Sequence, residues 1–371
     1  MRRSIDESRA GVRAVEVVQH WTKSTVTQPD AVHALVTGAS GFIGMHLAER
    51  LLRAGKRVRL FVRRPEAVEE LRQLGAEVVV GSLDDAKAIG RAVDGVETVY
   101  HLAAMTSALS VAEMLRANAE GPRNVALACA AQQQRPLLVQ VSSVAAAGPA
   151  RRGEVRSETD LPEPISNYGR SKLAGEQAVA EFAGELPITI VRPGIVFGPR
   201  NLEMLPMFRL IKYLNWHPVP GWRPPALSLV HIDDCLDLIL AAATQGTRLP
   251  EPKGDPLAQL ASGWGVYFAA ASEYPNYSEL GRLMGQILGR PWAVTMPVGP
   301  LPWFAARWSE RIALLRRKSN SFNLDKIREA TAESWACSSE RAERELGFAL
   351  PQSLKERLQS TVDWYRTQRW L

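Results

Sequence analysis

The chain has 371 residues, of which 46% are hydrophobic and 23% are charged, with a formal net charge of +6. This length accommodates one large α/β domain with a smaller satellite and a sizeable core. The basic residues are scattered and form no zinc-finger spacing or RNA-binding signature, so we expect no nucleic-acid partner. The three cysteines, Cys129, Cys235 and Cys337, lie far apart and are odd in number, which argues against a disulfide framework and a metal site.

The N-terminal residues 1–31 lack the apolar core of a secretory signal, and no segment approaches the ~18 consecutive apolar residues of a membrane span. We therefore expect a cytoplasmic protein without a transmembrane segment. Residues 1–31 are interpreted as an extension outside the fold, or as the result of a start site assigned too far upstream.

From residue 33 onward β and α patterns alternate, which predicts a doubly wound parallel sheet of the Rossmann type with helices on both faces. The expected strands cover residues 33–37, 58–62, 77–80, 97–102, 137–142 and 188–192, and a further strand is expected at 266–271.

A glycine-rich turn, Gly38-Ala-Ser40-Gly41-Phe42-Ile43-Gly44, follows the first expected strand. Gly38 permits a sharp turn, Gly41 permits backbone N–H groups to approach a phosphate, and Gly44 permits close contact between helix and strand. The positive N-terminus of the following helix lies beside this turn. The turn therefore predicts the pyrophosphate site of a dinucleotide cofactor.

The end of the second strand normally carries an acid for the ribose 2′-OH of NAD, or has an arginine nearby for the 2′-phosphate of NADP. This chain has Arg63 and Arg64 there, with no carboxylate at the strand tip. Guanidinium groups bind a phosphate bidentately, so the sequence favours NADP(H) over NAD(H). The alternatives are a solvated arginine pair that begins the next helix, and a contact from Glu66 to the ribose.

Tyr168 and Lys172 are four residues apart in a helical pattern, so both side chains point from the same face. A neighbouring cation stabilises a phenolate, and we therefore expect Lys172 to lower the pKa of Tyr168 and make it a general acid or base. The apolar strand at 137–142 ends in Ser142 and Ser143, at the edge where ligands bind in open α/β sheets.

Together these motifs resemble the extended short-chain dehydrogenase/reductases, a likeness that spans nearly everything from residue 33 onward. The resemblance implies that Ser143 hydrogen-bonds the reacting oxygen, that Tyr168 passes the proton, and that Lys172 holds the nicotinamide ribose. Asn118 joins these catalytic candidates through its match to a helix of that family. Other matching segments imply cofactor contacts from Ser82, Leu83, Ala103, Ala104, Pro193, Gly194 and Val196.

One residue departs from the family pattern, because Ser82 stands where an acid typically faces the adenine. His101 and His231 are interpreted as packing residues at strand ends. Asp233 and Asp234 are interpreted as an N-cap with first-turn charge rather than as a metal pair. No metal site is expected.

The family contains simple oxidoreductases as well as nucleotide-sugar epimerases and dehydratases. The segment from Arg192 through Pro193 and Gly194 to Pro199 looks like the 3β-hydroxysteroid dehydrogenase and dihydroflavonol-reductase-like branches, and Val144 and Ala145 occupy the place of a dehydratase's acid pair. The sequence therefore favours hydride transfer between a ketone and a secondary alcohol on a bulky, hydrophobic small molecule. A nucleotide-sugar epimerase or dehydratase, and a non-catalytic NADP(H)-sensing regulator, remain as alternatives.

Residues 32–192 are assigned to the cofactor domain, to which segments near 226–245 and 266–272 return, and residues 193–371 mainly to an interleaved substrate-binding domain. The stretch 202–225, rich in Pro, Trp and apolar residues, is expected to be a substrate cover rather than part of a sheet. A helix at 302–317 carries apolar residues on one side and ends in a basic run; we expect it to pack on the cofactor domain, with a membrane surface or a partner subunit as alternatives. The resemblance also implies a homodimer.

Overall fold

The computed structural model of the protein describes residues 32–316, 320 and 322–371. The expected extension at 1–31, and part of the basic run after Arg316, lie outside the described residues.

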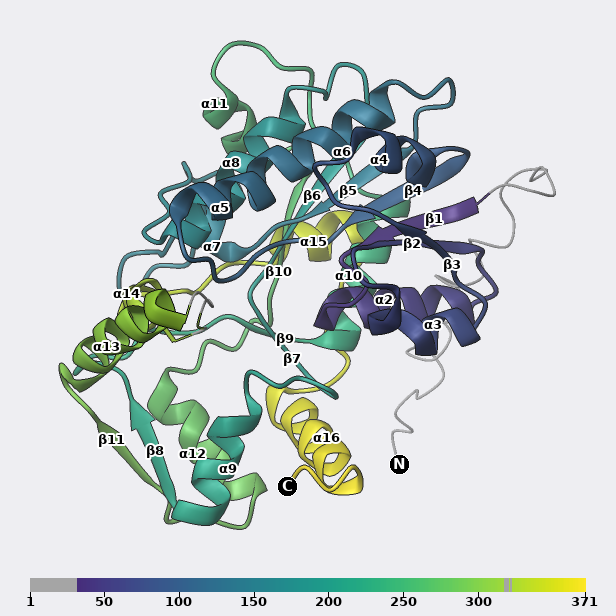
Figure 1. Cartoon of the computed structure of the whole chain (residues 1–371). Helices are drawn as coiled ribbons and strands as arrows, with labels where there is room; N and C mark the ends of the chain where they lie inside the picture. Colours follow the sequence, from purple (N-terminus) through teal and green to yellow (C-terminus); the bar gives the residue numbers. More distant parts are fainter. Residues whose placement is uncertain (1–31, 317–319, 321) are drawn as a thin grey trace, which may run out of the picture.

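A seven-stranded parallel sheet forms the centre of the molecule (Figure 1). Its strands, in spatial order, are β10 (Val266–Ala269), β6 (Ile188–Pro193), β5 (Leu137–Val141), β4 (Val96–His101), β1 (Val32–Thr37), β2 (Val58–Val62) and β3 (Glu77–Val80). The expected strands are confirmed to within about two residues at each end. The strand order reverses between β1 and β4, which is the point where open α/β sheets bind ligands.

Helices cover both faces of this sheet (Figure 1). One face carries α2 (Phe42–Arg53), α3 (Glu69–Gln73), α10 (Ile232–Thr244) and α15 (Glu340–Leu346). The other carries α4 (Ala86–Val93), α6 (Gly121–Ala130), α8 (Asn167–Ala180) and α11 (Pro256–Ala261). The doubly wound Rossmann fold is thereby confirmed.

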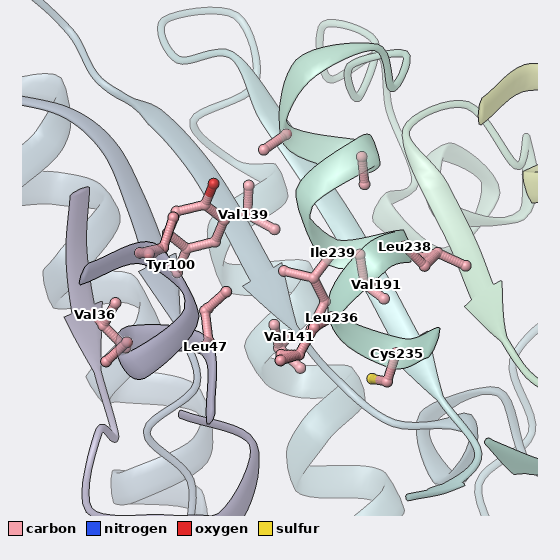
Figure 2. Packing of buried hydrophobic residues seen from close by; sticks show 14 of the residues in the cluster. Val36, Leu47, Tyr100, Val139, Val141, Val191, Cys235, Leu236, Leu238 and Ile239 are labelled. Carbon is pink, nitrogen blue, oxygen red and sulfur yellow. The ribbon is translucent and has the colours of Figure 1, made fainter. Parts of the chain in front are cut away.

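Buried side chains from the sheet and the helices form the core between α2, α10 and the strands. Figure 2 shows Tyr100 of β4 and Val139 of β5 in this cluster, together with Leu47 of α2 and Ile239 of α10. Each fully buried apolar side chain of this size contributes about 2 kcal/mol through removal from water. This rigid platform fixes the strand ends on which the candidate site is built.

A second, smaller region lies beyond the carboxyl ends of the strands (Figure 1). It contains two short parallel sheets, in which β7 (Ile195–Phe197) pairs with β9 (Leu229–His231), and β8 (Trp216–Val219) pairs with β11 (Val294–Pro297). The helices α9 (Leu205–Leu214), α12 (Tyr277–Ile287) and α16 (Leu354–Thr367) pack together beside them.

The expectation that residues 202–225 are no part of a sheet is wrong, because this stretch contains β8, which pairs with β11. It also contains α9, in which Leu205, Phe208 and Ile211 recur at helical spacing and are buried. Pro206 lies in the first turn of α9, where proline costs no hydrogen bond. This proline therefore marks the start of a helix.

The expected helix at 302–317 is present as α13 (Leu301–Arg316), but it does not pack on the cofactor domain. It packs against α14 (Leu324–Ala330), and most of its large apolar side chains are exposed. Within the part of the chain that the structure describes, no helix is both long and apolar enough to cross a membrane.

Candidate active site

The glycine turn after β1 lies directly against the chain that leaves β4. Gly38 has a φ of +73°, and a Cβ added there would lie 2.6 Å from the backbone nitrogen of Ala103. Glycine is therefore required both by the backbone conformation and by the close approach of the backbone of Leu102 and Ala103. This contact brings two of the predicted cofactor segments together at the reversal point of the sheet.

The start of α2 fits the pyrophosphate of a dinucleotide. A Cβ on Gly44 would lie 2.3 Å from the carbonyl oxygen of Gly38, so the helix meets the turn without space for a side chain. Gly41 is the N-cap residue, and no side chain caps the helix. Ser40, Phe42 and Ile43 lie in the same turn and first helical residues. The uncapped N–H groups and the positive end of α2 suit an anion.

Hydrogen bonds of Thr37, at the end of β1, to His101 and to the chain that leaves β4 fix the relative position of these two strand ends. The hydroxyl of Thr37 hydrogen-bonds Nδ1 of His101 at 2.8 Å and accepts a hydrogen bond from the backbone N–H of Ala103 at 3.2 Å. Burial lowers the pKa of His101 to about 3, with a further contribution from the charge of Lys172. His101 is thus a neutral packing residue, as predicted.

Arg63 and Arg64 follow β2 and are exposed. Among the described residues neither guanidinium has a hydrogen-bond or ion-pair partner, so both are available to an anion beside the crevice. Ser82 lies after β3 with its hydroxyl near Asp84, and Leu83 packs against Gly121.

The proton-transfer candidates come from the carboxyl end of β5 and the start of α8. Ser143 is the N-cap of α7 (Val144–Ala147), where its Oγ accepts a hydrogen bond from the N–H of Ala145 at 3.1 Å. A Cβ on Gly169 would lie 2.3 Å from the carbonyl oxygen of Ala145, so glycine lets α8 press against α7. This close packing places Tyr168 next to Ser143, whose hydroxyl acts to lower the pKa of the phenol.

The pKa of Tyr168 is raised above its ordinary value, contrary to the expectation that Lys172 lowers it. Burial of the phenol is the largest cause; the charge of Lys326 and the hydrogen bond from Ser143 act in the opposite direction. The cation that acts most on Tyr168 is therefore Lys326, whose position the sequence pattern did not predict.

Lys172 is buried and donates a hydrogen bond from Nζ to the carbonyl oxygen of Val141 at 2.9 Å. Burial lowers its pKa to about 8, while the charge of Glu176 opposes this shift. Glu176 in turn forms a fully buried ion pair with Arg192 of β6, with the closest N–O distance 2.6 Å. The two charges compensate each other, so the pair can lie buried beneath Lys172. A single unpaired charge at this depth would be very costly.

Asn118 lies in a short π-helix (Arg116–Glu120), a helix type that is frequent at functional sites. Its side chain exchanges hydrogen bonds with the backbone of Met105 at 2.7 and 2.8 Å and donates to Oγ of Ser171 at 2.9 Å. Ser171 donates to the carbonyl oxygen of Tyr168. Asn118 therefore joins the chain after β4 to the helix of Tyr168.

Helix α14 contributes residues that sequence analysis missed. Lys326 Nζ lies 5.3 Å from the centre of the Tyr168 ring and is 3.1 Å from a carboxylate oxygen of Glu329. Glu329 also accepts a hydrogen bond from Ser166, the N-cap of α8, at 2.7 Å. Asp325 accepts from the backbone N–H groups of Asn167 and Tyr168 at 2.9 and 3.0 Å. A carboxylate at this helix N-terminus is electrostatically favourable.

The remaining predicted residues lie where β6 ends. Pro193 is the last residue of β6, and a Cβ on Gly194 would lie 2.5 Å from the carbonyl oxygen of Ser228. Val196 belongs to β7. His231 is buried as the N-cap of α10, and Asp234 in the first turn forms an ion pair with Arg357 of α16. Over the described residues no cluster of side chains suitable for a metal is found.

A Rossmann crevice with a glycine cradle, together with a serine at the end of β5 and a tyrosine and a lysine on α8, defines a nicotinamide-dependent enzyme of the short-chain dehydrogenase/reductase type. Residues 34–254 match the NAD dependent epimerase/dehydratase family. This match covers more than half of the chain, and the protein belongs to that family. The resemblance to the extended short-chain dehydrogenase/reductases is thereby confirmed.

Two curated relatives align with most of the chain. The ceramide reductase of Caulobacter vibrioides is 30% identical over 337 residues, which cover 91% of this chain and 95% of the relative. Sterol demethylase protein B of Methylococcus capsulatus is 29% identical over 348 residues, which cover 90% and 98%. Among solved structures, the UDP-glucose 4-epimerase of Thermotoga maritima with UDP-glucose has a TM-score of 0.71 at 21% identity, covering 91% of this chain and 99% of that one. This last likeness shows the fold.

Proposed function

We propose that this protein interconverts a ketone and a secondary alcohol on a bulky, hydrophobic small molecule, with NADP(H) as the redox partner. The observation that carries the proposal is the close packing of α8 on α7 at Gly169, which brings Tyr168 and Lys172 of α8 to Ser143 at the carboxyl end of β5. When bound, the nicotinamide supplies or accepts the hydride.

Tyr168 is set to act as the proton donor in the reducing direction. Its raised pKa keeps the phenol protonated over the neutral range, which an acid needs. Ser143 accepts from the N–H of Ala145, which leaves its single hydroxyl proton to be donated either to the phenol or to a bound substrate oxygen. Lys172 is the residue that would hold the nicotinamide ribose.

Lys326 acts through Tyr168 as a positioning residue. Loss of the phenolic proton creates a negative charge in a buried place, and the ammonium group above the ring stabilises it. Asn118 has a similar indirect part, because its hydrogen bonds fix the helix that carries Tyr168. Lys326 and Asn118 are therefore positioning residues, whereas Ser143, Tyr168 and Lys172 are expected to touch the reactants.

NADP(H) is favoured because Arg63 and Arg64 are exposed beside the crevice, with no partner among the described residues. Free guanidiniums suit the 2′-phosphate, which NAD lacks. Ser82 retains a hydroxyl that is able to hydrogen-bond the adenine, and Leu83 lies beside it.

A hydrophobic substrate is supported by the site's surroundings and by the relatives. Val144 and Ala145, which follow Ser143, are buried and apolar, so this part of the site offers no acid pair for a dehydration. Pro193 and Gly194 occupy the place where a diphosphate-binding asparagine is common in nucleotide-sugar enzymes. The names of the two relatives, a ceramide reductase and a sterol demethylase protein, both point to lipid substrates.

A nucleotide-sugar epimerase or dehydratase is the second candidate, favoured by the shared fold of the UDP-glucose 4-epimerase. The match to an enzyme family gives no support to a regulator without catalytic activity.

The homodimer and the cytoplasmic location remain predictions. Exposed Val111, Leu115 and Leu127, on the helical segment that leads into α6, offer apolar surface for a helix-pairing dimer.

The proposal is tested by a substrate screen with the purified protein. Steroid ketones, flavonoid-like ketones and long-chain β-keto compounds are supplied with NADPH, and a panel of UDP- and GDP-sugars is supplied with NAD⁺ or NADP⁺. We expect ketone-dependent loss of the nicotinamide absorbance and an alcohol of matching mass. Conversion of the sugars alone, without net cofactor consumption, would make the second candidate the correct one.

A further inference from the structure

Helix α13 presents a continuous apolar stripe on the side that faces away from the rest of the protein. The stripe follows helical spacing, so its members lie on one face. Phe304 is 63% exposed, Trp308 64% and Leu315 85%. We call this stripe the outer face of α13; it consists of Leu301, Phe304, Trp308, Ile312 and Leu315.

The opposite side of α13 is tied to α14 by small and polar residues. Ala306 is buried, Ser309 donates to the carbonyl oxygen of Phe322 at 2.7 Å, and Glu310 accepts from the N–H of Leu324 at 2.9 Å. The helix is therefore held in its orientation by polar contacts, with its apolar side in water. An exposed apolar surface of this kind marks an interaction site.

Arginine side chains surround the outer face. Arg307 and Arg311 lie one turn apart beside the stripe, and the guanidinium of Arg311 lies 5.6 Å from the ring centre of Trp308. Within α13 three arginines, Arg307, Arg311 and Arg316, outnumber the single carboxylate of Glu310. The helix is thus apolar on its outer face and carries a net positive charge.

A cavity of about 590 Å³ opens at the N-terminal end of α13. Trp222 and Trp303 form aromatic walls, and the lining also contains two arginines, Arg152 and Arg223, and one acid, Glu333. Val294 and Met296 of β11, the strand that precedes α13 in the chain, are also exposed. Aromatic side chains next to arginines are typical of surfaces that lie at the boundary between lipid headgroups and acyl chains.

We propose that the outer face of α13 docks the protein onto the surface of a bilayer that contains anionic lipids. Charge decides between this occupant and a second copy of the chain. A symmetric dimer through this face would bring Arg307 and Arg311 of one copy toward the same residues of the other, and like charges oppose such contact. Anionic headgroups neutralise them instead. The docking does not depend on the reaction proposed above.

The test is co-sedimentation of the full chain with vesicles of phosphatidylcholine alone and of phosphatidylcholine mixed with phosphatidylglycerol. We expect binding to the mixed vesicles that weakens with added salt, and at least tenfold weaker binding to the neutral ones. Arg307→Ala/Arg311→Ala should lose about thirtyfold in affinity, corresponding to about 1 kcal/mol for each arginine.

The apolar contribution is tested with Phe304→Ser/Trp308→Ser against a matched control, Leu74→Ser/Leu161→Ser, which alters two exposed leucines elsewhere. The first variant should lose vesicle binding and the control should keep it, with thermal unfolding unchanged in both. Wild-type protein that ignores mixed vesicles, or a Phe304→Ser/Trp308→Ser variant that binds as well as wild type, overturns the proposal. So does a vesicle-free dimer that this variant dissociates.

Discussion

Tyr168 lies between two regions that hold it by different means. On the side of the large sheet, α8 presses on α7 so closely that a Cβ at Gly169 would lie 2.3 Å from the carbonyl oxygen of Ala145. On the other side, α14 reaches it with charged groups, Asp325, Lys326 and Glu329. The first region fixes where the phenol is; the second adjusts how readily it gives up its proton.

This difference explains why one region carries a recognisable motif and the other does not. Close backbone packing requires glycine and serine at fixed positions, which leaves a pattern in the sequence. By contrast, any lysine that the fold places near the ring can supply the ammonium group, so this contact requires no fixed sequence pattern. The predictions below separate the two contributions, beginning with the phenol that both regions serve.

The largest expected effect belongs to Tyr168→Phe. Removing the hydroxyl eliminates the proposed proton donor while keeping the ring that packs against α14, so turnover should fall by about 100- to 10,000-fold. Cofactor affinity, measured by fluorescence titration, should stay nearly unchanged. Turnover within a few-fold of wild type would remove Tyr168 from the mechanism.

Next in size is cofactor choice. In Arg63→Ala/Arg64→Ala, charge-assisted hydrogen bonds to the 2′-phosphate are lost, so NADPH binding should weaken by about 10- to 100-fold while NADH binding hardly changes. Arg72→Ala, which removes an exposed arginine of α3, serves as the control. Equal affinities of the unmodified protein for the two cofactors would contradict the assignment.

The close-packed side is tested by Gly169→Ala, with Gly90→Ala of α4 as the matched control. The new methyl group at Gly169 meets the carbonyl oxygen of Ala145, whereas a Cβ on Gly90 meets nothing within 4 Å. We expect Gly169→Ala to lose about 1–3 kcal/mol of unfolding free energy and about tenfold in turnover. Gly90→Ala should be slightly stabilising, because alanine is the better helix former. A tolerated Gly169→Ala would show that this packing does not position Tyr168.

The charged side is tested by Lys326→Met, whose effect should appear in the pH profile. Alcohol oxidation needs the deprotonated phenol, so its rate should rise with pH until the pKa of Tyr168 is passed. Loss of the Lys326 charge should move this rise upward by about one pH unit. Ketone reduction below that range should change little.

Two further variants complete this test. Lys326→Arg should restore the wild-type profile, and Lys355→Met, an exposed lysine of α16, should leave it unaltered. If the pH profile of Lys326→Met coincides with that of the wild type, Lys326 has only a structural role and does not adjust the pKa of Tyr168.

Much of the cofactor side could be predicted from the sequence. Alternating patterns located the strands, and the spacing of Gly38, Gly41 and Gly44 located the turn, because both depend on contacts between near neighbours in the chain. The four-residue spacing of Tyr168 and Lys172 likewise placed both on one helix. Its consequence for the pKa of Tyr168 was wrong, since burial outweighs the charge of a lysine that is occupied with Val141.

The substrate side could not be predicted in the same way. Asp325 reaches Tyr168 across 157 residues of sequence, and no local pattern records such a contact. The periodicity of α13 predicted a helix correctly, but periodicity does not tell which partner covers the apolar side. In α13 that side faces outward.

The central claim, that the reaction moves a hydride between cofactor and substrate once per turnover, is tested most directly with isotope. Wild-type protein is given a hydrophobic ketone from the screen and NADPH with both hydrogens at C4 of the nicotinamide replaced by deuterium, and the product is measured by mass spectrometry. We expect one deuterium in each alcohol formed and one oxidised cofactor released for each product. Product without deuterium, or many turnovers for each cofactor consumed, would contradict it.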